Sequence, residues 1–329
     1  MNATTTTIPV SDCTFRAMAS AIALTVVDPG PSAASALGRA EAAIREVEAT
    51  CSRFDPASAL SRANAAPDEW HVVPAATARA VGEAARAYIE TGGLFDPRVL
   101  QVLLRWGYDR TLPFEEGFVH DGAAGRPGLS ATEPHGAAPG PWAPQILEHD
   151  GVWQLHLGGQ PIDLGGIGKG LAVRWAAAEL AAAGRGFLVD AGGDVAVGGV
   201  SPDGGRWRVG IEDPAGGPEP VLVLEVTDTG CATSSTRLRR WRSGGEQVHH
   251  LVDPRTGRPG GVGLASVTVL HPDPASAEMW AKALFLSGAD GIRAAAGALG
   301  APAAWVGVDG SVGTSAAMNP LVTWRRDHG

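Results

Sequence analysis

The segment best suited to bind phosphate is a glycine-rich run that follows an apolar stretch. It has the sequence Ile162-Asp163-Leu164-Gly165-Gly166-Ile167-Gly168-Lys169-Gly170 and opens an alanine-rich stretch that predicts a helix. Glycines let backbone N–H groups approach a phosphate, a helix start carries partial positive charge, and Lys169 adds a full charge. The run has neither GxxxxGK[ST] nor GxGxxG spacing, so a strand-to-helix turn without a ligand stays an alternative.

Two adjacent histidines, His249 and His250, form a second candidate centre. They fall on a predicted strand, where neighbouring side chains point to opposite faces, so only one of them can face a given site. A histidine beside a phosphate site can act as an acid or base because its pKa is near neutral. The alternative is a structural histidine without a chemical role.

Charged pairs occur at two further places. Asp190 and Asp194 flank a tight turn at Gly192-Gly193, a pattern that is also typical of a hairpin whose aspartates bind their own backbone. Glu278 and Lys282 are four residues apart and share one face of a predicted helix. The alternative for this second pair is a salt bridge on the surface.

The elements that must position these residues are hairpins interleaved with helices. Hydrophobic periodicity and the positions of glycine and proline predict helices over residues 33–50, 74–90, 97–106, 167–183, 275–287 and 290–297. They predict strands over 17–27, 152–157, 160–164, 206–211, 221–226, 248–252 and 265–270, and hairpins within 187–200 and 303–316, with a further hairpin turn at 158–159. This order favours an α+β fold with antiparallel sheets over a doubly wound parallel sheet.

Composition excludes several classes of protein. The chain has 329 residues, 44% of them hydrophobic, and a net charge of −9, which disfavours disorder and nucleic-acid binding. Three distant cysteines give no zinc ribbon. No apolar run approaches the roughly 20 residues of a membrane-spanning helix, and the N-terminus lacks a signal-peptide pattern, so we expect a cytoplasmic protein without membrane insertion. We expect one domain over residues 1–329, with a Gly/Pro-rich surface insertion at about 115–144.

Several motifs in order along the chain resemble the ApbE family of FAD:protein FMN transferases. They are Phe15-Arg16-Ala17-Met18, Ser52-Arg53-Phe54-Asp55-Pro56 with Ser61, Arg62 and Asn64, Leu94-Phe95-Asp96-Pro97 with Leu104, Trp106 and Gly107, residues 163–170 and 188–193, Ala232-Thr233-Ser234, and residues 250–259. The resemblance implies an α+β, T-fold-like architecture of antiparallel sheets and flanking helices, with a flavin in a cleft. It also implies an enzyme that splits FAD and attaches FMN through a phosphoester to a Thr or Ser hydroxyl of an acceptor protein.

The same resemblance implies roles for individual residues. Those that would contact FAD are Met18, Phe54, Leu94, Phe95, Asp96, Asp163, Lys169 and Val252. His250 would help catalysis by taking the proton of the acceptor hydroxyl, a step for which a nearby carboxylate is the alternative. A magnesium ion on the pyrophosphate would be held by the backbone of Gly166 and by a helix pair that here consists of Glu278 and Lys282.

The sequence departs from the family pattern in this helix pair. Where the family has Asp-x-x-x-Thr, this chain has Glu278-Met279-Trp280-Ala281-Lys282. We expect the Lys282 ammonium to take over part of the charge neutralisation, with Lys282 turned away and Glu278 binding the metal as the alternative. The departure leaves two other functions open: an FAD-binding protein without transfer activity, and an FAD pyrophosphatase that releases FMN and AMP.

Overall fold

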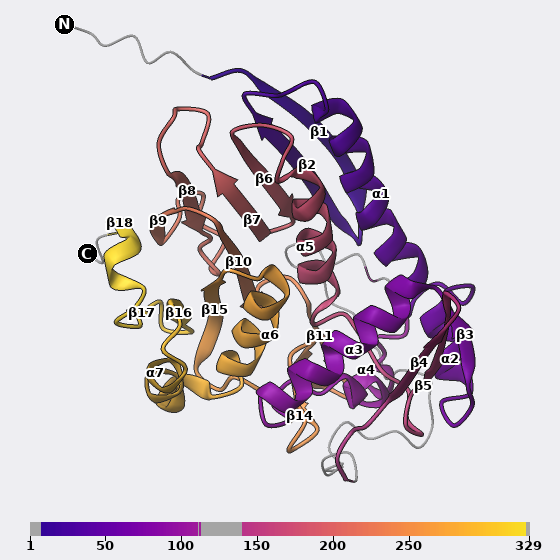
Figure 1. Cartoon of the computed structure of the whole chain (residues 1–329). Helices are drawn as coiled ribbons and strands as arrows, with labels where there is room; N and C mark the ends of the chain where they lie inside the picture. The colour runs from indigo at the N-terminus through magenta and orange to yellow at the C-terminus, as the bar shows by residue number, and fades with distance from the viewer. Residues whose placement is uncertain (1–7, 111, 113–139, 327–329) are drawn as a thin grey trace, which may run out of the picture.

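The structure, a computed structural model, describes residues 8–110, 112 and 140–326. Its centre is an eight-stranded sheet of order β1-β2-β6-β7-β10-β15-β16-β17, in which all neighbouring strands are antiparallel (Figure 1). These strands are β1 Val10–Ala17, β2 Ser20–Val27, β6 Gly186–Ala191, β7 Asp194–Gly199, β10 Thr229–Ser235, β15 Leu264–His271, β16 Ala303–Gly307 and β17 Val312–Thr314. The predicted α+β class with antiparallel sheets is confirmed.

Helices pack against this sheet or against one another. They are α1 Ala33–Cys51, α2 Ala59–Ala65, α3 Ala75–Glu90, α4 Leu100–Arg105, α5 Gly168–Leu180, α6 Pro274–Phe285 and α7 Gly288–Leu299, with short 3-10 turns at Pro97–Val99 and Asn319–Leu321. Helix α5 packs between α1 and α6 and also contacts β6 and β7, whereas α6 contacts β10 and β15. The six predicted helices are thus confirmed to within a few residues. Within the described residues, no helix is both long and apolar enough to cross a membrane.

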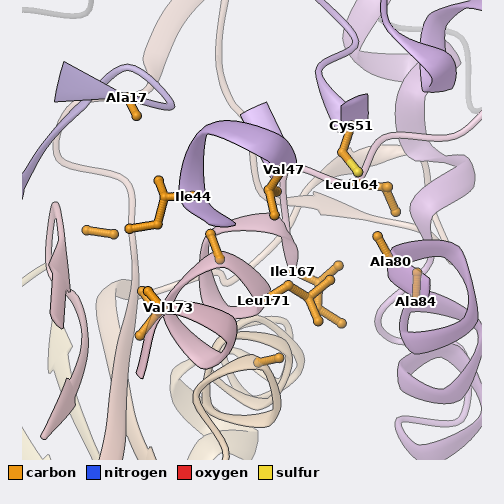
Figure 2. Close-up of a cluster of buried hydrophobic side chains, with 14 of the residues drawn as sticks. Ala17, Ile44, Val47, Cys51, Ala80, Ala84, Leu164, Ile167, Leu171 and Val173 are labelled. Atoms are coloured by element: carbon orange, nitrogen blue, oxygen red, sulfur yellow. The ribbon is translucent and has the colours of Figure 1, made fainter. Parts of the chain in front are cut away.

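The main core lies between α1, α3, α5 and the sheet (Figure 2). Helix α1 contributes Ile44 and Val47 from its predicted apolar stripe, and α5 contributes Leu171 and Val173. The turn before α5 adds Leu164 and Ile167 to the same cluster. The buried side chains of Leu164 and Ile167 thus anchor the glycine-rich segment to the core.

A second core lies on the other face of the sheet. Along β7, Val195 and Val197 belong to this second cluster, whereas Ala196 belongs to the first, as the alternation of a strand requires. A smaller sheet of order β18-β9-β8 covers this face, with strands β8 Trp207–Ile211, β9 Leu222–Val226 and β18 Val322–Arg325. The central strands are therefore buried on both sides, which explains their nearly continuous apolar sequences.

Three strand predictions are wrong. The predicted strand over residues 248–252 is interrupted, because β12 Glu246–His249 ends at His249 and β13 Val252–Asp253 begins at Val252, so His250 lies between two strands. Residues Gln160–Leu164 do not form a strand, so Gly158-Gly159 is not the turn of a hairpin. Instead β5 Val152–His156 pairs with β4 Gln145–His149 and with β3 His71–Val73. Residues 17–27 are not one strand either, because Met18 and Ala19 form the turn between β1 and β2 with φ angles of 53° and 58°.

The remaining strands form two short hairpins, β11 Arg240–Ser243 with β12 Glu246–His249, and β13 Val252–Asp253 with β14 Arg258–Pro259. Most of the predicted insertion at about 115–144 lies outside the described residues, apart from residues 140–144, which lead into β4. The organisation of residues 1–329 as one domain stays a prediction.

Candidate functional site

A cavity of about 950 Å³ lies beside the turn between β1 and β2, the end of α1, the glycine-rich turn before α5 and the segment after β12. Pockets that bury small-molecule ligands span roughly 300–1,000 Å³. The predicted site residues that line it are Met18, Phe54, Leu94, Phe95, Asp96, Asp163, Gly166, Lys169, His250, Val252 and Lys282. The tertiary structure thus brings nearly all the predicted site residues around one space; Glu278 is the exception, since it does not line the cavity.

The glycine-rich turn is held largely by its own hydrogen bonds. Asp163 Oδ1 accepts the N–H of Gly165 at 2.8 Å, and the Leu164 carbonyl accepts the N–H of Gly168 at 2.8 Å. The N–H of Gly170 donates to Glu278 Oε2 at 2.7 Å. These three N–H groups are therefore already paired within the chain, and much of the positive charge that a bound anion needs must come from side chains.

Lys169, at the start of α5, is paired with a buried carboxylate. Its ammonium donates to Asp194 Oδ2, and the side-chain exposures are 17% for Lys169 and 3% for Asp194. The other aspartate of this hairpin, Asp190, accepts the N–H of Gly193 at 2.9 Å, as expected for an aspartate that stabilises its own turn. Lys169 lines the cavity, but Asp194 neutralises much of its charge.

Glu278 is buried on α6 and acts on the start of α5. Besides its hydrogen bond to Gly170, it lies near enough to Asp194 for the two charges to repel. Burial and the charge of Asp194 raise the pKa of Glu278 to about 7, against the opposing effects of Lys169, the Gly170 N–H and Lys282. Glu278 forms no ion pair with Lys282, so the predicted alternative of a surface salt bridge between them is wrong.

Lys282, one turn after Glu278, is half-buried and lines the cavity. Its Nζ lies 5.8 Å from the centroid of the Phe95 ring. A Cβ atom added to Gly166 would overlap this Nζ, so the ammonium lies directly against the glycine-rich turn. Burial lowers the pKa of Lys282, Glu278 and Asp163 oppose that effect, and Arg239 and Lys169 add to it.

The two histidines have different surroundings. His250 lines the cavity, and its Nδ1 lies 3.3 Å from the carbonyl oxygen of Arg239. Because a carbonyl only accepts, Nδ1 carries the proton and Nε2 keeps a lone pair. Burial, with the charges of Arg239, Lys282 and His249, lowers the pKa of His250 well below its usual range, so its ring is neutral at pH 7.

His249 faces away from the cavity lining. Its ring packs edge-on against Phe285 at 6.1 Å, and its Nδ1 accepts the N–H of Leu251 at 3.3 Å. Burial lowers the pKa of His249 to about 4. Of the two neighbours, His250 is therefore the one placed to act on a ligand in the cavity.

Asp96 has a structural partner in addition to its place in the lining. Its carboxylate receives Nη2 of Arg98 at 2.8 Å and Nε of Arg98 at 3.0 Å, and it caps the following 3-10 turn by accepting the Arg98 N–H at 2.9 Å. The pair is buried. The carboxylate is thereby fixed in place, which is what a ligand contact from this position requires.

Arg53 was not predicted as a site residue, although its motif was. Its guanidinium lies between two rings, 4.0 Å from the centroid of Phe54 and 4.5 Å from that of Tyr108. Nε lies 3.4 Å from Asp163 Oδ1, and Nη1 donates to the Tyr108 carbonyl at 2.7 Å. Nη2 is buried and has no hydrogen-bond partner among the described residues. Its position inside Ser52–Pro56 is the signal that identifies it, whereas no local pattern marks Tyr108 or Arg239, which also line the cavity.

Comparison with known proteins gives one consistent family. The model described as "ApbE family" matches residues 18–305. The FAD:protein FMN transferase of Treponema pallidum is 30% identical over 252 residues, which cover 70% of this chain and 65% of the relative. The Escherichia coli K12 protein of the same name is 31% identical over 142 residues, 43% of this chain and 40% of the relative. The matched regions thus span less than two thirds of these relatives.

Solved structures share the fold. The ApbE protein of Thermotoga maritima superposes with a TM-score of 0.76 at 23% identity, covering 97% of this chain and all 100% of the other. The apo flavinyl transferase ApbE of Pseudomonas stutzeri gives a TM-score of 0.73 at 23% identity, covering 96% of this chain and 98% of the other.

Proposed function

This chain belongs to the ApbE family, and on that basis we propose that it is an FAD:protein FMN transferase. The observation that carries the proposal is the single cavity that gathers the predicted flavin contacts, the cations of the glycine-rich region and a neutral histidine. FAD is the proposed substrate. An acceptor protein with a Thr or Ser hydroxyl is the proposed second substrate.

The reaction is a phosphoryl transfer at the FMN phosphorus. The acceptor oxygen forms a bond to that phosphorus, the bridging bond of the pyrophosphate breaks, and AMP leaves with the electron pair. The hydroxyl proton must go to a base, because a neutral hydroxyl is a poor nucleophile. His250 is the proposed base, since its Nδ1–H is directed to the Arg239 carbonyl and its Nε2 is unprotonated.

Apolar and polar residues of the cavity lining would contact different parts of FAD. Met18, Phe54, Leu94, Phe95 and Val252 supply apolar surface for the flavin and adenine rings. The polar wall carries Asp96, Asp163 and Lys169, of which Asp163 is held between Arg53 and the Gly165 N–H. The pyrophosphate would lie near His250 and toward the lysines of the lining, Lys169 and Lys282, because the carboxylates of Asp96 and Asp163 would repel it.

The test follows FAD and its products. The protein is incubated with FAD and a host-cell extract, separated on a denaturing gel, and scanned for flavin fluorescence, with mass spectrometry of any fluorescent band. Transfer predicts a protein that gains the mass of FMN less one water on a Thr or Ser. Free FMN and AMP without a labelled protein would show a pyrophosphatase instead, and unchanged bound FAD would show a carrier; either result contradicts the proposal.

Binding gives an independent check. We expect FAD to bind more tightly than riboflavin in calorimetric titration, because riboflavin lacks the phosphates and the adenine. Equal affinities would contradict the proposed contacts of the cavity with the pyrophosphate and the adenine. The cytoplasmic location stays a prediction, which fractionation of the host cell tests.

A further inference from the structure

The two lysines of the cavity wall differ in their partners. Lys169 is paired with Asp194. Lys282 lines the same cavity, yet it makes no hydrogen bond or ion pair with any described residue. The carboxylates of Glu278 and Asp163 act on this ammonium without pairing with it directly. A half-buried ammonium without a direct partner is unfavourable by itself, and an anion in the cavity would stabilise it.

The place of this ammonium is fixed by its neighbours. It occupies the space beside Gly166 that a side chain there would fill, and it lies over the Phe95 ring at 5.8 Å. Several N–H groups of the adjacent turn are already paired within the chain. An anion bound at the turn would therefore lie next to the ammonium of Lys282, which is the unpaired cation of α6.

The same position is where family resemblance implies a magnesium ion. The residues present do not fit one. An ammonium has three donor hydrogens and no lone pair, so Lys282 cannot be a ligand, and its charge repels a divalent cation beside Gly166. Glu278, the remaining carboxylate of the pair, is turned to the Gly170 N–H at 2.7 Å and does not line the cavity.

We propose that the Lys282 ammonium binds the pyrophosphate of FAD in place of a divalent metal, so that FAD binding by this protein is independent of magnesium. This inference rests on the proposed function, because it takes FAD as the ligand. Lys282 would then be a catalytic residue, since it contacts the phosphate oxygens on which negative charge develops as AMP leaves.

The experiment measures dissociation constants of FAD and riboflavin by calorimetry, once in EDTA and once in excess magnesium chloride. The proteins are the unmodified chain, Lys282→Met, Lys282→Thr and Lys282→Arg. The matched control is Arg293→Met, which removes an exposed cation on α7 that lies against Trp305 and away from the cavity.

For the unmodified chain and the control, we expect the same FAD affinity with and without magnesium. Lys282→Met should weaken FAD about tenfold or more, which corresponds to one charge-assisted hydrogen bond, and leave riboflavin unchanged. Lys282→Arg should keep most of the FAD affinity. Lys282→Thr should bind FAD more tightly in magnesium than in EDTA, because it restores an oxygen ligand.

Loss of FAD binding by the unmodified chain in EDTA, with recovery in magnesium, would overturn the inference and leave the proposed function standing. Unchanged FAD affinity in Lys282→Met would do the same. Absence of FAD binding under every condition would overturn both. If Lys282→Met fails to fold, the comparison of EDTA with magnesium in the unmodified chain and in Lys282→Arg still decides the matter.

Discussion

The Lys282 ammonium occupies the space beside the α-carbon of Gly166 into which a side chain at position 166 would project. A glycine of the turn before α5 and a lysine of α6, far apart in the sequence, are thus complementary. The predicted phosphate turn and the altered helix pair are parts of the same site.

Gly166→Ala should therefore displace the Lys282 ammonium and weaken FAD binding. The overlap is mainly with the flexible end of the lysine, and Phe95 Cε2 would lie 3.2 Å away, so the fold should survive with a loss of stability of about 1–3 kcal/mol. Calorimetry should show weaker FAD binding and little change for riboflavin. Weakening of both ligands by the same factor would mean that the new methyl group blocks the flavin instead.

His250→Ala should slow transfer strongly while FAD still binds, because the base is lost and the cavity is enlarged. Loss of a general base typically slows a reaction about 10²–10⁴-fold. The matched variant is His249→Ala, which removes the ring packed on Phe285 and should lower stability more than activity. The assay is flavin fluorescence on a denaturing gel, alongside thermal unfolding; a slower rate in His249→Ala alone would refute the assignment.

Gly170→Ala should destabilise the protein by about 1–3 kcal/mol, because the added Cβ would lie 2.7 Å from the Pro274 carbonyl oxygen and 2.7 Å from the α-carbon of Ala275. Both are backbone atoms at the start of α6, so the two helices must separate. Gly38→Ala in α1 is the control, since nothing lies within 4 Å of its new Cβ. Urea denaturation should show a loss for the first variant and none for the second.

Asp273 should make the protein sensitive to strong acid. It caps α6 and is bonded to Arg174 through Nε and Nη2, both at 2.5 Å. Burial alone would raise its pKa, but the hydrogen bonds from Arg174 and Ser276 prevail and lower it to about 2.

A lowered pKa in the folded state stabilises the protein above the pKa of the unfolded state and is lost as the pH falls through about 2. The contribution of Asp273 is about 2 kcal/mol. Asp273→Asn should thus lower stability at pH 7 and flatten the decline between about pH 4 and pH 2, measured by thermal unfolding across that range. An unchanged slope would show that other carboxylates dominate the acid response.

Ala19→Gly should stabilise the hairpin of β1 and β2 by about 1 kcal/mol. Ala19 has a φ of 58°, a conformation that costs an alanine roughly 1–2 kcal/mol and a glycine little. Ala21→Gly, in the regular part of β2, is the control and should destabilise by about 0.5–1 kcal/mol. Equal effects of the two changes on urea denaturation would contradict the strain at residue 19.

The sequence by itself determined most of the local elements and predicted most of the candidate residues that line the cavity. The apolar stripe of Leu37, Ala40, Ile44 and Val47 predicted α1, because the periodicity of a helix depends only on residues close together in the sequence. Glycine-glycine turns such as Gly192-Gly193 predicted the hairpin of β6 and β7 for the same reason. Motif order pointed to residues that the fold then placed around one cavity.

Only the tertiary structure decided the pairings between distant segments. The strand β5 pairs with β4 and β3 rather than with residues 160–164, and Lys169 is paired with Asp194 while Lys282 lies unpaired against Gly166. Such pairings depend on how helices and strands pack against a shared core, which sets the distances between side chains far apart in the sequence. The residues next to a charged side chain in the sequence do not identify its ion-pair partner. Whether the side chain is paired is therefore known only from the folded structure.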